Sequence, residues 1–431
     1  MTAGLRRSRL AFAVGLAHSL VSLALTACVS PDDSVGGPGS SVTEASGQNA
    51  PNGLLRRAAY QHAAPGDVLE VQIDELRPTQ GAVGYDQVYY RLARWQPDLG
   101  RRAWRDDPIR LLDYLNRTLG SRIDDYCEDT GQGRRRARFG SLSDARAVHL
   151  NDASTFACTD APGTHITALK TVVVGWDGTL YLTDGHHSFS ALREVADGGP
   201  ALKVWVKVDA NYHDAVDREA FWQQLIADRR AWLRDGNNQP IAIDRLPTRL
   251  GLMGPEPGGM ADDPYRSLVY FTRGIGYTNA GLPDFGEFLW ADWLRGQVAA
   301  GRLKGLDAHH LRHPPPALGD ILAFSTFGND LRPEGSDDSY AALVRNAALL
   351  MASLADDDVV LAPWTAADLR RTPLVPGTKM GSIEEARTLL EELPRTDQGD
   401  PASGPRHGGK LWFAVNYRTC GAPAPGTCWG W

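Results

Sequence analysis

Residues 182–192 read LTDGHHSFSAL, and this stretch decides which fold the chain is expected to adopt. Two apolar runs, 171–176 and 179–182, lie just before its turn and are separated by the pair Asp177-Gly178. An Asp-Gly pair between runs rich in β-branched and aromatic residues predicts a two-residue β-hairpin turn. The chain is therefore expected to reach the two histidines from the second strand of a hairpin.

A helix is predicted directly after the turn at Asp184 and Gly185, because apolar residues recur at helical spacing from 189 to 195. His186 and His187 then occupy the first turn of that helix. A helix N-terminus presents unpaired N–H groups and the positive end of the helix dipole, which favour phosphate or carboxylate. Histidine changes charge near neutral pH. The combination predicts an anion-binding or acid–base site.

The two histidines allow two interpretations. His186 and His187 can act as general base and general acid, or one of them can position a phosphate. Successive helical residues point about 100° apart, so one imidazole is expected in the cleft and the other to be held by a hydrogen bond. In the alternative, Asp184 caps the helix and the histidines are structural. We predict His186, His187 and Asp184 as the catalytic residues.

An ordered set of motifs resembles the family called Putative ParB-like nuclease, a branch of the ParB/sulfiredoxin superfamily. The similarity spans about residues 65–300 and is carried by the segments 71–80, 181–187, 262–271 and 287–295. The resemblance implies an α+β fold, a small mixed ParB/sulfiredoxin-like domain, with hydrolysis of a phosphodiester as the reaction. The strand and helix order read from the sequence agrees with that fold class.

Five further residues are predicted to bind substrate: Gly185, Ser188, Arg77, Gln80 and Arg266. The resemblance implies that the loop carrying Arg77, Thr79 and Gln80 approaches the glycine–histidine turn, although turn chemistry explains these residues equally well. An arginine can clamp a phosphate in a bidentate manner. The alternative for Arg266 is a salt bridge to Asp262 or Glu287.

Cofactors and metals are not expected. ParB proteins place Gly-Glu-Arg-Arg at the helix start, whereas this chain has Gly-His-His-Ser at 185–188, so nucleotide binding of the ParB kind is not expected. His186 stands where sulfiredoxins have a cysteine, which excludes their chemistry. His309, His310 and His313 come directly before three prolines and lack the carboxylate of an H-E-x-x-H motif, so no metal site is predicted.

The N-terminus resembles a bacterial lipoprotein signal. A basic start is followed by the apolar run 10–25 and by Leu-Thr-Ala-Cys at 25–28. We predict a signal peptide at 1–27, lipid on Cys28, and a flexible tether at 28–59. Val29 gives no inner-membrane retention cue, so outer-membrane lipid is the expected partner and the cell envelope the location. The alternative is an ordinary secretory signal with a coincidental cysteine.

The charge of the chain argues against a general nucleic-acid binder. The formal net charge is −7, and removal of the three arginines in residues 1–27 changes it to −10. A protein that binds nucleic acid through its phosphates needs an overall basic surface. The expected ligand is therefore a phosphorylated or otherwise anionic molecule, and nucleic acid is not supported by the net charge.

Four cysteines remain when Cys28 is set aside. An even number in an oxidising compartment predicts two disulfides. Of three connectivities, proximity in the sequence favours Cys127–Cys158 and Cys420–Cys428. Neither pair has the C-x-x-C spacing of a redox or zinc site.

The chain is expected to contain a core domain at 60–245, with a polar insertion at 121–165, and a mostly helical extension at 246–399. A Gly/Pro-rich tail follows at 400–431. Strands are predicted at 68–73, 202–208 and 411–417, a strand or a helix at 85–92, and helices at 107–119, 214–233, 285–298, 339–354 and 382–393.

The leading hypothesis is a lipid-anchored envelope protein that binds an anionic ligand at the histidine turn and hydrolyses phosphodiesters. A non-catalytic envelope binding or structural protein with the same fold is the alternative, because a fold does not by itself establish a function.

Overall fold

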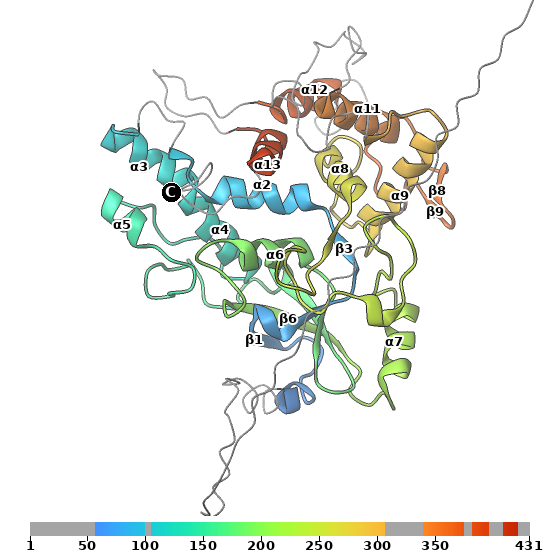
Figure 1. The fold of residues 1–431 in the computed structure, drawn as a ribbon, viewed down its shortest axis with the longest axis horizontal. Coiled ribbons are helices and arrows are strands. Elements are labelled where there is room, and N and C mark those ends of the chain that lie inside the picture. Colours follow the sequence, from blue (N-terminus) through green and yellow to red (C-terminus); the bar gives the residue numbers. More distant parts are fainter. Residues whose placement is uncertain (1–56, 100–104, 307–338, 375–381, 396–407, 421–431) are drawn as a thin grey trace, which may run out of the picture. The chain divides into compact units, whose positions relative to one another are not determined.

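The computed structural model describes residues 57–99, 105–306, 339–374, 382–395 and 408–420 (Figure 1). The predicted signal peptide, Cys28, nearly all of the tether, Cys428 and the three histidines at 309–313 lie outside the described residues. Within the described ranges, no helix has the length and apolar character needed to cross a membrane.

A mixed five-stranded sheet forms the centre of the α+β fold, in the order β1-β6-β4-β5-β2. Its strands are β1 (Val68–Gln72), β2 (Leu76–Pro78), β4 (Lys170–Val174), β5 (Leu180–Leu182) and β6 (Lys203–Asn211). The pairs β1/β6 and β4/β5 are antiparallel, whereas β4/β6 and β2/β5 are parallel. The predicted hairpin is therefore confirmed as β4–β5, but its turn is longer than the two residues expected, because the last paired residues are Val174 and Leu180.

Two pairs of short strands lie outside this sheet. They are β3 (Ala82–Val83) with β7 (Ala261–Asp262), which is parallel, and β8 (Val359–Leu361) with β9 (Trp364–Thr365), which is antiparallel. The β3–β7 pair matters most for function, because it brings the segment after β2 beside a segment almost 180 residues later, Val83 pairing with Asp262.

The described helices are interspersed with the strands along the chain and include a counterpart of each predicted helix. They are α2 (Tyr85–Trp95), α3 (Pro108–Arg117), α4 (Leu119–Asp129), α5 (Leu142–Ala147), α6 (His186–Glu194), α7 (Arg218–Ala227), α8 (Pro264–Thr272), α9 (Gly286–Ala299), α11 (Tyr340–Ala352), α12 (Ile383–Glu392) and α13 (Lys410–Thr419). Short 3-10 turns occur at Ile73–Glu75, Ile166–Ala168 and Ile243–Arg245.

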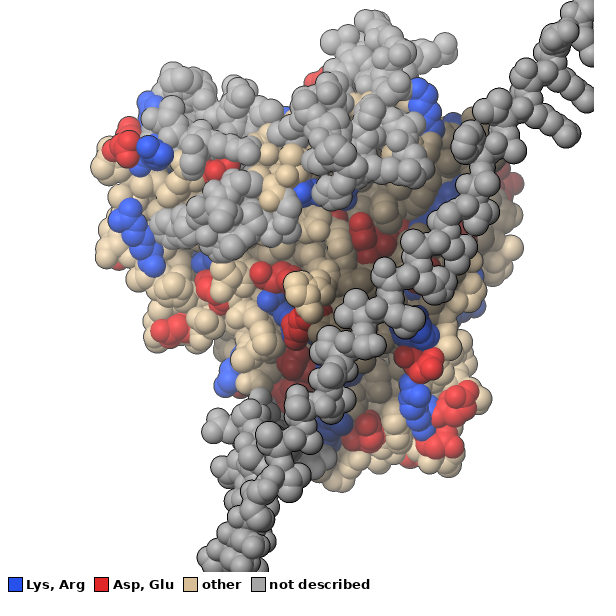
Figure 2. Space-filling model, viewed as in Figure 1, with Lys and Arg blue, Asp and Glu red and all other residues tan. Residues whose placement is uncertain are grey.

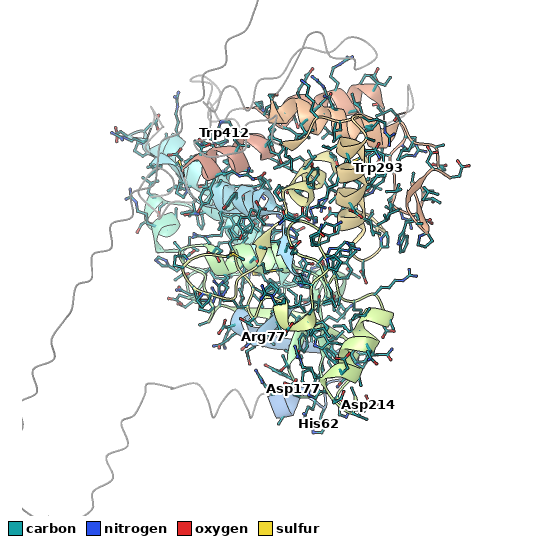
Figure 3. The ribbon with its side chains drawn as sticks, turned by 45° about the vertical axis from the view of Figure 1, so that its right-hand side comes forward. His62, Arg77, Asp177, Asp214, Trp293 and Trp412 are labelled. Carbon is teal, nitrogen blue, oxygen red and sulfur yellow. A yellow bond between two sulfur atoms is a disulfide. The ribbon has the colours of Figure 1, made fainter. Side chains whose placement is uncertain are left out.

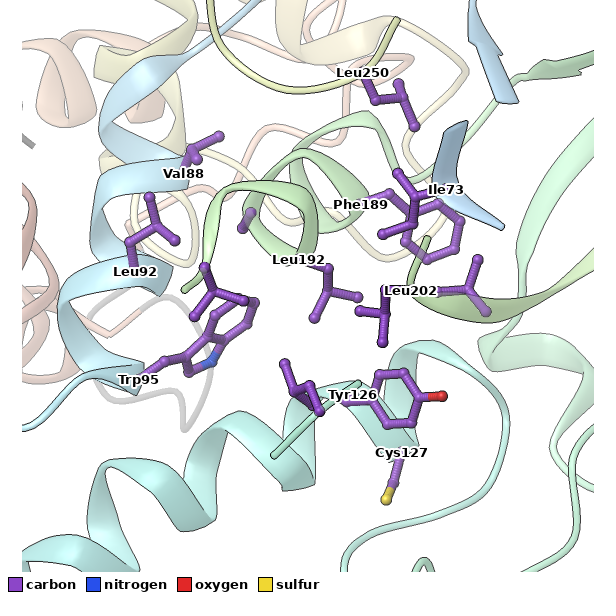
Figure 4. Packing of buried hydrophobic residues seen from close by; sticks show 14 of the residues in the cluster. Ile73, Val88, Leu92, Trp95, Tyr126, Cys127, Phe189, Leu192, Leu202 and Leu250 are labelled. Atoms are coloured by element: carbon purple, nitrogen blue, oxygen red, sulfur yellow. The ribbon is translucent and has the colours of Figure 1, made fainter. Parts of the chain in front are cut away.

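The main core lies between α6, α2, α4 and the sheet (Figure 4). Phe189 and Leu192 of α6 are fully buried and pack with Trp95 of α2 and Tyr126 of α4. Each fully buried side chain of this size contributes about 1.5–3 kcal/mol relative to an exposed one. The helix that begins with the two histidines is thus fixed along its opposite face by the core.

A second core joins α8, α9, α11 and one face of α13. Trp293 of α9 belongs to this second core, whereas Trp412 of α13 belongs to the main core (Figure 3). Helix α13 therefore packs into both cores, against α2 on one side and the C-terminal helices on the other.

The predicted strand at 411–417 is wrong, because these residues lie within α13. All seven are buried, so the segment shows no amphipathic period. A short run that is apolar except for one residue, here Asn416, cannot be assigned to a strand or a helix by its period alone. The helix predicted at 214–233 is shorter than expected. Asp217 caps the start of α7 by accepting a hydrogen bond from the Ala220 N–H, and the helix ends at Ala227.

The segment 121–165 contributes more to the core than its polar composition suggests. Helix α4 carries Ile123 and Tyr126 into the main core. Cys127 and Cys158 form a disulfide with a Cα–Cα distance of 5.7 Å, as predicted. Cys420 is disulfide-bonded, but Cys428 lies outside the described residues, so the second pairing remains a prediction.

Candidate functional site

The glycine before α6 is required by the backbone. Gly185 has φ +100, which L-residues with a side chain rarely adopt. A Cβ atom at this position would lie 2.5 Å from Cγ of Lys170. Asp184 does not cap the helix, because no side-chain hydrogen bond caps α6. Its side chain is exposed instead. The capping role considered for Asp184 is therefore wrong, and a structural role of the two histidines stays an open alternative.

Both histidines are buried, with exposed fractions of 3% for His186 and 8% for His187. The Thr79 N–H donates to Nε2 of His186 at 3.2 Å, and the Gly84 N–H donates to Nε2 of His187 at 3.0 Å. The sequence predicted one such restrained ring, and the structure restrains both. Two backbone segments about a hundred residues earlier in the chain therefore fix the orientation of both imidazoles.

These contacts also fix the protonation of the rings. A nitrogen that accepts a backbone N–H carries no proton, so each neutral ring carries its proton on Nδ1. Burial lowers the pKa of His186 to about 3. Burial, followed by the positive charge of Arg266, places the pKa of His187 well below its ordinary value. Both imidazoles are neutral at pH 7, and the described residues offer neither Nδ1–H an acceptor.

Helix α8 presents the arginine of the site. Asp263 caps this helix by accepting hydrogen bonds from the N–H groups of Tyr265 and Arg266, both at 3.0 Å. The backbone of Gly84 packs directly against this turn, since a Cβ atom there would lie 2.7 Å from the Ser267 nitrogen. The segment that holds His187 therefore also sets the position of Arg266.

Arg266 is 4% exposed and forms an ion pair with Glu287 at the start of α9. The salt bridge considered from the sequence is thus present, with Glu287 as its partner. Glu287 also accepts hydrogen bonds from Arg273 and from the Tyr277 hydroxyl. Nε and Nη1 of Arg266 are buried and have no partner among the described residues. Burial lowers the pKa of Arg266 to about 10, which leaves it charged at neutral pH.

These groups line a cavity of about 560 Å³, which we call the histidine cavity. Its charged lining consists of four cations and four acids: Lys207, Arg230, Arg266, Arg273, Asp184, Asp209, Asp284 and Glu287. Arg230 pairs with Asp209, and Glu287 pairs with two of the arginines. The formal charge of the lining is therefore zero, and Lys207 has no ion-pair partner among the described residues.

Most of the predicted site residues meet in this cavity. Asp184, Gly185, His186, His187, Gln80 and Arg266 all line it. Arg77 and Ser188 are not among the lining residues. Arg77 lies in β2, and its Nη1 donates to the Asp74 carbonyl at 2.7 Å. Ser188 is 6% exposed within α6.

The sequence did not single out Gly84, Lys207 and Arg273 as site residues. Lys207 lies within a strand whose side chains alternate between apolar and polar. In such a strand a lysine normally indicates only which side faces solvent. The sequence gives only a weak indication that Gly84 has a special position: it follows Gly81 closely, in a segment flanked by strand-forming residues. No local pattern marks Arg273, since its role depends on α8 lying beside α9.

The model of the family described as Putative ParB-like nuclease matches residues 69–296, more than half of the chain. No curated protein matches. The crystal structure of protein Atu1540 from Agrobacterium tumefaciens is 20% identical, and the match covers 68% of this chain and 93% of that one, with a TM-score of 0.36.

Proposed function

The chain belongs to the Putative ParB-like nuclease family, and from this premise we propose that it binds a small phosphorylated anion in the histidine cavity. The observation that carries the proposal is the restraint of both imidazoles through Nε2. It leaves two neutral Nδ1–H donors on the first turn of a helix, where the helix dipole also favours a negative group.

Arg266 supplies the positive charge of the proposed site. Its guanidinium lines the cavity and retains two buried nitrogens without partners among the described residues. A buried donor without a partner costs free energy, about 1–3 kcal/mol, which a bound oxyanion can recover. The planar fork of a guanidinium matches the oxygens of a phosphate group.

The charge of the lining favours a small ligand over a long nucleic acid. Its four cations are balanced by four acids, so the cavity has no strong long-range attraction for a polyanion. On the face drawn in Figure 2, basic and acidic side chains are interspersed. Binding that depends on many phosphate contacts needs a continuous basic surface. We therefore propose a ligand with one phosphodiester or phosphomonoester group.

Hydrolysis of a phosphodiester is the reaction implied by the family description. In this chain the donors Nδ1–H of His186, Nδ1–H of His187 and the Arg266 guanidinium would stabilise the charge that develops on the phosphorane. A general base works best when its pKa lies near the working pH, and both imidazoles have pKa values far below that range. The proposal therefore assigns the histidines as donors. We also propose that Cys28 anchors the protein in the envelope.

The test compares two substitutions of one histidine. In His187→Gln the amide oxygen of the side chain can still accept a hydrogen bond from the Gly84 N–H, but the variant lacks the Nδ1–H donor. In His187→Asn the side-chain amide occupies the position of Nδ1, and no side-chain atom remains to accept the Gly84 N–H. We expect His187→Gln to fold like the wild type but to bind bis(para-nitrophenyl) phosphate roughly tenfold more weakly, as expected when one hydrogen bond to a charged group is lost.

We expect His187→Asn to lose about 1–3 kcal/mol of unfolding free energy, because a buried N–H is left without a partner. Calorimetric titration and denaturant unfolding measure both effects. Wild-type affinity in His187→Gln would refute the proposed site. Release of para-nitrophenolate, with and without chelator, then decides whether the bound ester is hydrolysed. Binding without hydrolysis would establish the non-catalytic alternative.

A further inference from the structure

A second cavity, of about 410 Å³, lies among α2, α8, α12 and α13. Its charged lining contains four cations and a single acid: Arg94, Arg273, Arg395, Lys410 and Glu392. The formal charge of this lining is +3, from four positive groups and one negative group. We call it the cationic cavity. The histidine cavity has a formal lining charge of zero, so an anion meets very different electrostatics in the two places.

Not all of this charge is neutralised by nearby acids. Arg94 pairs with Asp125 at 2.9 Å, and Arg395 pairs with Glu392 at 3.5 Å through an exposed contact. Exposed ion pairs of the second kind contribute little and leave the arginine free to take another partner. Lys410 has no ion pair among the described residues.

Aromatic rings hold the cations in the cavity. The Arg273 guanidinium lies 5.1 Å and the Lys410 Nζ 5.4 Å from the centre of the Tyr270 ring. Tyr90, Tyr270 and Phe413 line the cavity together. Helix α13 begins at Lys410, so its positive dipole end adds to the same field.

We propose that the cationic cavity binds a multiply charged anion of the pyrophosphate class, and that this anion antagonises ligand binding in the histidine cavity. The link is Arg273, which lines both cavities and forms an ion pair with Glu287. An anion that draws Arg273 toward the cationic cavity leaves Glu287 to pair with Arg266 alone. Arg266 then has less free charge for a phosphorylated ligand.

The antagonism must be reciprocal, because a coupling free energy between two sites affects both ligands by the same factor. Saturation with pyrophosphate is therefore expected to weaken the binding of bis(para-nitrophenyl) phosphate by roughly fivefold, and the reverse titration to show the same factor. The pyrophosphate site itself does not depend on the function proposed for the histidine cavity.

The experiment titrates the whole protein with inorganic pyrophosphate by calorimetry. Lys410→Gln and Arg395→Gln change exposed residues, so folding is not at risk, and each is expected to weaken pyrophosphate binding roughly tenfold. The matched control is Lys203→Gln, which removes an exposed cation paired with Glu70 at the far edge of the sheet. This control is expected to bind pyrophosphate like the wild type.

His187→Gln separates the two proposals, because pyrophosphate should bind to this variant with unchanged affinity even if the histidine cavity proves to have no ligand. Unchanged affinity in both Lys410→Gln and Arg395→Gln would overturn the cationic site. Equal losses in Lys203→Gln would have the same meaning, because they would show a non-specific charge effect. Independent binding of the two anions in the wild type would overturn the antagonism alone.

Discussion

The histidine cavity and the cationic cavity share Arg273 but differ in how they can attract an anion. The first combines neutral imidazoles, one buried arginine and a balanced set of charges. The second gathers four cations around aromatic rings with one acid. Neutral, oriented donors recognise the geometry of an oxyanion at short range, whereas an excess of cations responds to total charge at long range. The two proposed sites therefore differ in kind, one selecting the shape of an anion and the other responding to its charge.

The largest expected effect comes from removing the histidine cavity through its backbone. Gly185→Val forces a β-branched residue to φ +100 and into Lys170, so we expect a loss of about 2–5 kcal/mol in unfolding free energy. Gly199→Val is the matched control, because Gly199 has φ +104 but a Cβ atom added there would have no atom within 4 Å. Denaturant unfolding of both variants separates steric overlap from backbone strain.

Gly185→Val should also abolish binding in the histidine cavity while pyrophosphate binding is retained in molecules that fold. Equal destabilisation of the two glycine variants would show that Lys170 does not restrict this position. Loss of both ligands from folded Gly185→Val protein would show that the cavities are not separable.

A fall in pH is expected to lower the unfolding free energy through His186 of the histidine cavity. The folded-state pKa of His186 is about 3, below the ordinary value of 6.5, so the unfolded state binds more protons between these values. The stabilising contribution is complete above about pH 6.5 and is lost as the pH falls toward 3, by about 1.4 kcal/mol per pH unit for one group. Unfolding at several pH values should show a shallower acid slope in His186→Gln than in the wild type.

Asp262 gives the opposite dependence of unfolding free energy on pH. This contribution is the same in His186→Gln and in the wild type, so it cancels when the two are compared. Burial raises the pKa of its carboxyl to about 7, so its contribution is complete below the ordinary carboxyl pKa and is lost as the pH rises toward 7. Parallel acid slopes in His186→Gln and wild type would contradict the buried neutral imidazole. An inflection near pH 6.5 in ligand affinity would favour histidine as an acid–base group.

A rise in salt concentration is expected to weaken anion binding to different degrees in the two cavities, with a smaller effect than the changes above. Between roughly 0.1 and 1 M salt the Debye length falls from about 10 to about 3 Å, which screens exposed charges far more than buried ones. We expect pyrophosphate affinity to fall roughly tenfold and bis(para-nitrophenyl) phosphate affinity by only about twofold over this range. Titrations at matched pH measure both, and equal losses would remove the proposed contrast.

Removal of the proposed lipid anchor is expected to have the smallest effect on ligand affinity in either cavity. Cys28→Ser should release the protein from the membrane fraction, and mass spectrometry of the mature N-terminus should find lipid on Cys28 in the wild type only. Both ligands should bind the released protein with wild-type affinity. Membrane retention of Cys28→Ser would refute the anchor and leave the two cavities unaffected.

The local part of the site could be predicted from the sequence. The turn pair Asp177-Gly178 and the spacing from 189 to 195 correctly place β4, β5 and α6, because the signals lie within one hairpin and one helix. The resemblance implied that the loop carrying Thr79 approaches the histidine turn, and the hydrogen bond from the Thr79 N–H to His186 confirms this approach. The role of Thr79 and Gly84 as donors to the rings could not be predicted, because they lie 107 and 103 residues before their histidines and no periodicity reports such distant contacts.

This distance also changes the expectation for truncating a histidine. A polar residue in the first turn of a helix normally contributes little packing, so His186→Ala would appear harmless from the sequence. The structure shows that the ring is 3% exposed and accepts a buried backbone hydrogen bond, so its loss leaves the Thr79 N–H unsatisfied. Tertiary contacts likewise explain why the segment 411–417 forms a helix, since it is enclosed by two cores.

The packing of α13 on α2 has a consequence for biosynthesis. The first helix of the main core lies against a helix that is made more than three hundred residues later, and Arg418 pairs there with the fully buried Asp86. During synthesis, α2 is therefore made long before the helix that covers it and before the arginine that pairs with Asp86. Folding intermediates with such exposed surfaces aggregate readily. We therefore expect removal of α13 (Lys410–Thr419) to destabilise the main core, and a chain shortened in this way should aggregate more readily.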